Sequence, residues 1–152
     1  MSDLEQVSAE EDLQKYVAFR LGDEMYGLPI GRIKEILNSW RVTRVPRGPA
    51  HLMGVANVRG QIVGVVDLRV RLGMPYAERD EDARLVLTSI QVEKDEVLVG
   101  LVVDEVKDIV SFSQSNVEPA ENFASKADLS MLEGGLTIND KALFVLKLEA
   151  VI

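Results

Sequence analysis

The stretch that most constrains the fold is NVRGQIVGVVDLR, residues 57–69, because its middle is apolar without interruption. Residues 62–66 are isoleucine, valine and one glycine, and a short β-branched run of this length is typical of a strand. A strand with two apolar faces belongs in the centre of a sheet or between two packed layers. Arg59, Asp67 and Arg69 stand at the ends of the run. They are interpreted as a catalytic pair, a structural clamp or a binding site.

Similar runs recur along the chain, separated by residues that favour turns. The charged loop EKDE joins two of them in a predicted hairpin, and Asn139-Asp140 is the predicted turn of the last hairpin. Residues 103–112 are expected to continue as strand, although their apolar spacing also fits a helix face. The other predicted strands are 16–21, 25–30, 42–45, 54–60, 62–68, 84–92 and 97–103, with two more after Gly135.

GRIKEILNSW, residues 31–40, has the apolar spacing of a helix. Its apolar residues at i, i+3, i+4 and i+7 are Ile33, Ile36, Leu37 and Trp40. This spacing predicts a short amphipathic helix whose apolar stripe packs on the rest of the protein. A second short helix is expected within residues 124–132.

The order of these elements indicates a mainly β domain. About nine or ten short strands and two or three short helices are expected, without the alternation of strand and helix that builds a parallel α/β sheet. Small mixed β-barrels or a sandwich fit this order. Residues 1–12 are polar and acidic and are predicted to be a flexible tail, so the folded domain is assigned to residues 13–152. No repeat at a fixed period is detected.

The residue inventory excludes several classes of function. The chain has no cysteine, which excludes disulfides and thiolate chemistry, and its one histidine, His51, leaves little basis for a metal site or acid–base catalysis. A net charge of −8 disfavours nucleic acid and anionic membranes as partners. The N-terminus is not a signal peptide, and no apolar run approaches the roughly 18 residues that span a bilayer. A soluble cytoplasmic protein without cofactors is expected.

Carboxylates are the groups left that offer a reaction centre. Asp104, Glu105 and Asp108 are close in sequence, but Lys107 stands between them, which favours a solvated strand edge over a metal cluster. Asp67 with Asp104 remains open as the carboxylate pair of a small hydrolase. No phosphate-binding loop, dinucleotide fingerprint or nucleophile elbow occurs. A β domain without a reaction centre most often binds other proteins, so no enzyme activity is expected.

Several blocks, in order, resemble the CheW family of bacterial chemotaxis adaptors. GVANVRGQIVGVVDLR is similar to the family's N-L-R-G type segment and the strand ending in D-L-R. The other matching blocks are FRLGDEMYGLPIGRIKEIL, TRVPRGPAHLMG, VGLVVDEVKDIVSF, VEPAENF and DKALFVLKLEAVI. Together they cover roughly residues 15–152, and their common order is more specific than any single motif.

The resemblance implies two small five-stranded SH3-like β-barrels, packed pseudosymmetrically around a shared core with a few short helices. It implies a non-enzymatic adaptor that links transmembrane chemoreceptors to the histidine kinase CheA, whose regulatory domain has the same fold. The receptor's cytoplasmic tip is expected in a groove between the lobes. The kinase domain and other CheW copies are expected as neighbours in arrays at the inner membrane. The alternatives are an adaptor of a non-flagellar chemosensory system and the carboxylate hydrolase.

The resemblance also carries over six receptor-binding positions. They are Ile33, Glu35, Gly54, Arg59, Val106 and Ile109. The apolar residues would meet the ridge of a helical hairpin, the glycine would permit close approach, and the charged pair would fix the register. For Ile33 and Val106 the alternative is a place in the core, and for Arg59 it is an internal ion pair with Glu35.

Phe123, in the block VEPAENF, is expected to anchor a contact with the kinase or within the ring. The chain departs from the family pattern here, because Glu118 stands where relatives carry a basic residue and Asn122 where an acidic one occurs. The charge complement of this contact is therefore expected to differ from that of relatives.

Overall fold

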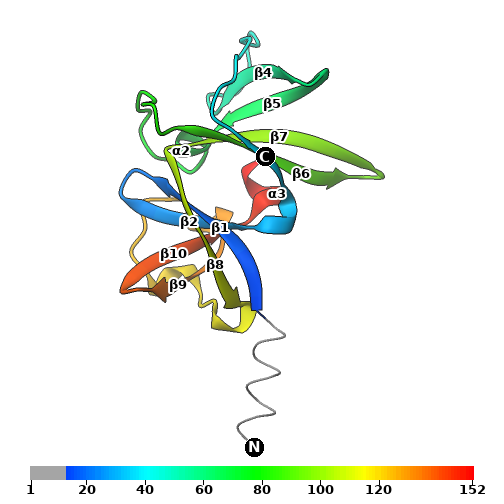
Figure 1. The fold of residues 1–152 in the computed structure, drawn as a ribbon. Coiled ribbons are helices and arrows are strands. Elements are labelled where there is room, and N and C mark those ends of the chain that lie inside the picture. Colours follow the sequence, from blue (N-terminus) through cyan, green and yellow to red (C-terminus); the bar gives the residue numbers. More distant parts are fainter. Residues whose placement is uncertain (1–12) are drawn as a thin grey trace, which may run out of the picture.

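The computed structural model describes residues 13–152, which form two five-stranded sheets (Figure 1). The first lobe contains β1 (Leu13–Leu21), β2 (Glu24–Pro29), β8 (Glu105–Ser113), β9 (Leu132–Ile138) and β10 (Lys141–Leu146). The second lobe contains β3 (Ile33–Leu37), β4 (Leu52–Val58), β5 (Gln61–Asp67), β6 (Arg84–Val92) and β7 (Asp95–Val103). The short helices are η1 (Ile30–Arg32), α2 (Leu68–Arg71), η2 (Gln114–Asn116), η3 (Ala120–Asn122), η4 (Leu129–Met131) and α3 (Leu148–Val151). The tail predicted at residues 1–12 lies outside the described residues.

The mainly β architecture is confirmed, and the two sheets share one topology. Their strand orders are β8-β1-β2-β10-β9 and β3-β6-β7-β5-β4. Each combines antiparallel pairs with one parallel pair, β2 with β10 or β5 with β7. In each lobe, the chain that follows one edge strand forms an isolated backbone bridge with the opposite edge strand. Thr43, after β3, pairs with Val55 of β4, and Glu118, after β8, pairs with Gly135 of β9. These bridges bring each sheet close to the predicted barrel. None of the helices in residues 13–152 has the length and apolar composition needed to cross a bilayer.

The chain contains an internal repeat that was not expected. The order β1 to β5 followed by α2 recurs as β6 to β10 followed by α3, and each half contributes two strands to one lobe and three to the other. Residues 26–37 and 99–110 read YGLPIGRIKEIL and VGLVVDEVKDIV, 73 positions apart. Later strands lose this period because the connections differ in length, residues 38–51 after β3 and residues 114–131 after β8.

The two lobes interlock around one central core. Its largest cluster contains buried residues of both lobes, including Val66 and Leu101 of the second lobe, and each lobe also has a smaller cluster of its own. Val63 and Val65 belong to the second lobe's cluster, whereas Val66 faces the central one. Because alternate residues of a strand point to opposite faces, the apolar run of β5 serves both.

The helix predicted for residues 31–40 is wrong. One 3-10 turn, η1, is followed by β3, which pairs with β6. The partners run from Ile33–Thr88 to Glu35–Leu87, so Lys34 is the extra residue of a β-bulge. The bulge interrupts the alternation of the strand and allows residues at i and i+3 to reach the same side, which imitates helical spacing.

The predicted hairpins are confirmed with small changes. β6 covers residues 84–92 as predicted, but its turn to β7 is shorter than EKDE, since Asp95 and Glu96 already pair with β6. Asn139 and Asp140 form the last turn with φ angles of 52° and 65°, which these residue types tolerate. Residues 103–112 are strand except for Asp104, where the chain bends between the end of β7 and the start of β8. The strand predicted at 42–45 is reduced to the Thr43 bridge, and the helix predicted within 124–132 is reduced to η4.

Candidate functional site

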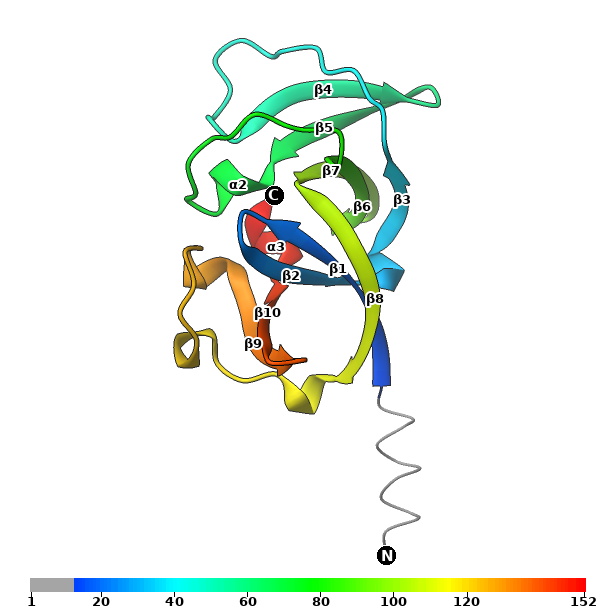
Figure 2. The same ribbon diagram turned by 60° about the vertical axis from the view of Figure 1, so that its left-hand side comes forward.

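A groove of about 380 Å³ is lined by residues of β3 in the second lobe and β8 in the first. Figure 2 shows the course of these two strands. Its surface is mostly apolar. Four of the six predicted receptor-binding residues line it, namely Ile33, Glu35, Val106 and Ile109. The fold thus brings together two segments that are separated by more than sixty residues of sequence.

The apolar residues of the groove are of two kinds, some exposed to solvent and some packed on the central core. Ile30, Ile36 and Ile109 are 40%, 38% and 52% exposed. Ile33 and Val106 are half-buried and pack against the central core. Ile33 and Val106 therefore contact the core and also line the groove, and their role as receptor contacts stays a prediction. Sequence reasoning missed Ile30 and Ile36 as groove residues; the match of IKEI with VKDI was the signal that would have indicated Ile36.

Arg59 lies outside the groove lining and is joined to it through Glu35. Nη1 of Arg59 donates a hydrogen bond to Oε1 of Glu35 over 2.5 Å, which joins the β4–β5 turn to the edge strand β3. The Arg59 side chain is 76% exposed and that of Glu35 is 25% exposed, so the pair contributes little to stability, about 0–1 kcal/mol. The internal ion pair is therefore present, and most of the guanidinium donors remain available to a ligand.

Gly54 lies at the seam of the second lobe, which is the place where the bridge between Thr43 and Val55 joins the two edges of the sheet. It does not line the groove. It is buried with φ 148°, beside two backbone hydrogen bonds of 2.8 and 2.9 Å between Thr43 and Val55. A Cβ on Gly54 would lie 2.1 Å from the Thr43 carbonyl oxygen. Gly134 repeats the arrangement in the first lobe, where a Cβ would lie 2.3 Å from the Glu118 carbonyl oxygen. Seam closure thus accounts for Gly54, and its role as a receptor contact stays a prediction.

The Phe123 side chain is fixed by contacts with the interior of the protein. Its half-buried ring meets Phe144 edge-on, with centroids 5.9 Å apart, and packs against the central core. The preceding segment is fixed by the backbone hydrogen bonds between Glu118 and Gly135. The exposed part of the ring is therefore rigidly presented, and its contact with the kinase or the ring stays a prediction.

The charged residues after β5 have structural partners. Asp67 caps α2 by accepting a hydrogen bond from the Val70 backbone N–H over 3.4 Å, and burial raises the pKa of this carboxyl. Arg69 donates to Asp104, which also accepts from the Gly22 backbone N–H over 2.7 Å. Asp104 therefore ties the second lobe to the β1–β2 turn of the first. Within residues 13–152, no group of three acidic or histidine side chains is arranged to hold a metal ion.

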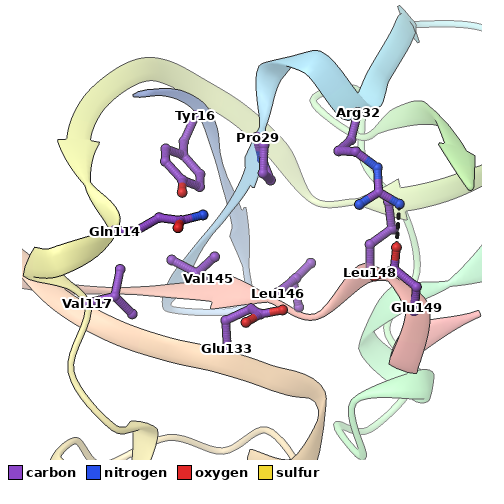
Figure 3. Close-up of a pocket in the computed structure, with 10 residues that line it drawn as sticks. All are labelled: Tyr16, Pro29, Arg32, Gln114, Val117, Glu133, Val145, Leu146, Leu148 and Glu149. Atoms are coloured by element: carbon purple, nitrogen blue, oxygen red, sulfur yellow. Dashed lines mark hydrogen bonds and ion pairs between the residues drawn. The ribbon is translucent and has the colours of Figure 1, made fainter. Parts of the chain in front are cut away.

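A second hollow, of about 420 Å³, is lined by parts of β1, β10 and α3 among other segments. Figure 3 shows the side chains that line it. Its side chains include Gln114 and Glu133, and Nη2 of Arg32 donates to Oε1 of Glu149 over 2.6 Å at one end. None of the predicted site residues lines this hollow. The more apolar groove between β3 and β8 is therefore the candidate site.

Comparisons with known proteins cover both lobes and hence the groove. The family model described as "CheW-like domain" matches residues 15–152. The "Probable chemotaxis protein CheW" of Rhizobium etli is 34% identical over 137 residues, which are 90% of this chain and 86% of that protein. Protein PilI of Pseudomonas aeruginosa is 34% identical over 90 residues, which are 59% of this chain and 48% of PilI. The crystal structure of the scaffolding protein TtCheW from Thermoanaerobacter tengcongensis matches with a TM-score of 0.78 and 29% identity, covering 88% of each chain.

Proposed function

Since the chain belongs to the CheW-like family, we propose that it is a non-enzymatic adaptor that couples transmembrane chemoreceptors to the histidine kinase CheA. The observation that carries the proposal is the exposed apolar groove between β3 and β8. Four of the six receptor-binding positions that the resemblance implies line it. A fifth, Arg59, is bonded to the groove residue Glu35.

The groove suits the tip of a helical hairpin. An apolar ridge with side chains at i, i+3 and i+4 would cover Ile36 and Ile109, which are exposed without a ligand. Glu35 and Arg59 stand at the rim, where charged groups select and orient a partner more than they add affinity. An apolar centre with a charged rim is the usual anatomy of a protein–protein interface.

The kinase contact is assigned to the first lobe around Phe123. A half-buried aromatic ring fixed against the core suits an interface anchor, because little side-chain entropy is lost on binding. Glu118, with an exposed side chain nearby, would select a basic group on the neighbour. The neighbours proposed are the regulatory domain of CheA and, in arrays, other CheW copies, on the cytoplasmic side of the inner membrane.

A hydrolase is disfavoured by the engagement of its only candidate pair. Asp67 caps α2, and Asp104 binds Arg69 and the Gly22 amide. Both carboxylates thus hold the chain together instead of facing a common substrate site. The scaffolding description of the TtCheW structure supports the same conclusion.

The similarity to PilI favours a second candidate, an adaptor of a chemosensory system other than flagellar chemotaxis. The groove and the rim charges would serve such a system equally well. The genes beside this one separate the two candidates, because flagellar chemotaxis and surface-motility systems have different neighbours.

Binding and kinase activity test the proposal together. We expect the purified chain to bind a chemoreceptor tip fragment and CheA, and to make kinase activity depend on the receptor. Ile109→Asp is expected to weaken receptor binding more than tenfold, since a buried isoleucine contributes about 1.5–3 kcal/mol. Ile62→Asp is the matched control, because Ile62 is 67% exposed and lies outside the groove. Absence of binding to both partners would refute the proposal, and equal losses in the two variants would refute the groove assignment.

A further inference from the structure

The groove is built from two copies of one sequence element. IKEI, residues 33–36, and VKDI, residues 106–109, supply eight of the ten residues that line it. Each copy carries a β-bulge at its lysine, Lys34 in β3 against β6 and Lys107 in β8 against β1. The same local backbone therefore presents both walls of the groove.

Because the two halves exchange equivalent strands reciprocally, the two walls occupy equivalent places in the repeat, which we take as approximate two-fold symmetry. Ile33 and Val106 are half-buried against the central core, and Ile36 and Ile109 are the exposed pair. An antiparallel helical hairpin with similar apolar side chains on its two helices also has approximate two-fold symmetry. Such a hairpin meets nearly equivalent apolar walls in either of two orientations, so apolar contacts alone do not select one.

Charge breaks this symmetry at the acidic position of the repeat. Glu35 on one wall is bonded to Arg59 over 2.5 Å. Its counterpart Asp108 on the other wall accepts a hydrogen bond only from the Ile109 backbone N–H, over 2.7 Å, among the contacts of residues 13–152. One wall thus has a neutralised carboxylate and the other has an exposed one.

The lysines of the repeat do not change this difference. Nζ of Lys34 lies 3.2 Å from a carboxylate oxygen of Glu96, and Nζ of Lys107 lies 3.5 Å from one of Glu105. Of the four charged groups in the two copies, Asp108 is therefore the one without an oppositely charged partner in the described part of the chain. It is the groove charge most available to a ligand.

We propose that Asp108 fixes the orientation in which a receptor hairpin enters the groove. This inference rests on the proposed adaptor function. The occupant is an antiparallel helical hairpin whose apolar ridge carries a lysine or arginine on one helix only, and that cation pairs with Asp108. The reverse orientation places the cation beside Glu35, where Arg59 already occupies the carboxylate and repels a second cation.

Orientation is measurable because the chain has no cysteine. Lys141→Cys, an exposed position at the start of β10, takes one spin label in the first lobe. Its distance to a label on one helix of the receptor tip fragment reports the orientation. We expect one distance population with Asp108 intact and two after Asp108→Asn, with affinity reduced about two- to fivefold, as for an exposed ion pair. Asp95→Asn removes an exposed carboxylate elsewhere and is expected to change neither result.

Moving the free carboxylate to the other wall gives the sharper test. Arg59→Asn releases Glu35, and asparagine suits the φ of 51° at this turn position. Combined with Asp108→Asn, it is expected to make the reverse orientation the major one. A single unchanged orientation in Asp108→Asn, or two orientations with Asp108 intact, would overturn the inference and leave the adaptor function standing. Failure of the chain with Asp108 intact to bind the fragment would instead overturn the proposed function.

Discussion

Gly54→Ala is expected to destabilise the protein by about 3 kcal/mol or more. The added Cβ would lie 2.1 Å from the Thr43 carbonyl oxygen and 2.8 Å from Cγ1 of Val42, inside the closest approach that real Cβ atoms show. Relieving such overpacking costs about 1–3 kcal/mol. The φ of 148° adds strain of about 1–3 kcal/mol for any residue with a side chain. The sum is a large part of the roughly 5–15 kcal/mol that stabilises a domain.

Two glycines of the same hairpin separate these causes. Gly60 has φ 85° but open space around its Cβ position, so Gly60→Ala is expected to cost only the strain, about 1 kcal/mol. Gly64 has one neighbour, Cδ1 of Leu52 at 3.9 Å, so Gly64→Ala is expected to be neutral or stabilising by less than about 1 kcal/mol. Gly134→Ala is expected to resemble Gly54→Ala, since its Cβ would lie 2.3 Å from the Glu118 carbonyl oxygen.

Urea unfolding followed by the fluorescence of Trp40, the only tryptophan, measures the series. Trp40 packs against the second lobe's own core and therefore reports on the seam. The reasoning is refuted if Gly54→Ala unfolds at the same urea concentration as Gly64→Ala. Loss of receptor binding in a Gly54→Ala protein of normal stability would identify Gly54 as a receptor contact.

Asp67→Ala is expected to cost about 1 kcal/mol in urea unfolding, because α2 loses its N-cap, whereas Asp67→Asn keeps a cap. Burial raises the folded pKa of Asp67, so the folded state binds this proton more tightly than the unfolded chain. The wild type therefore loses stability as pH rises through that pKa, and Asp67→Asn is expected to lack this loss when unfolding is compared at acid and neutral pH. Arg59→Glu is expected to weaken receptor binding by more than about 1.4 kcal/mol, which is a tenfold change, because the rim loses a cation and gains a second carboxylate beside Glu35. Unfolding of this variant would instead identify Arg59 as a structural clamp. Asp104→Asn is expected to lower the free energy of unfolding by about 1–3 kcal/mol, because Arg69 and the Gly22 amide lose a charged acceptor; an unchanged thermal midpoint would contradict this role.

Strand composition was the most reliable predictor in this chain. β-branched runs predicted β6 over residues 84–92, and the residue types of Asn139-Asp140 predicted the tight turn of the last hairpin. The error at residues 31–40 arose because Lys34 bulges from β3 and lets Ile33 and Ile36 imitate a helix. The same spacing in VKDI, with Lys107 bulged in β8, was interpreted correctly only because its surroundings are richer in valine.

The site was predictable in part, and the limit has a physical cause. The family resemblance pointed to Ile33, Glu35, Val106 and Ile109, which the fold gathers in one groove. It also pointed to Gly54, which the structure places at a seam, because a glycine needed for a close backbone bridge and one needed for a close ligand look alike in sequence. The charge difference between Glu35 and Asp108 depends on where Arg59 reaches, which no local pattern encodes.

The sequence by itself determined the strand-rich class, the turns, the absence of cysteine chemistry and the family. These follow from composition and from residues that are neighbours along the chain, where local conformational preference acts. The tertiary structure decided that the two halves exchange strands, that IKEI and VKDI face each other across a groove, and that Asp104 binds both lobes. Such contacts join residues 35 to 82 positions apart in the case of Asp104, and they form only when the central core brings both halves together.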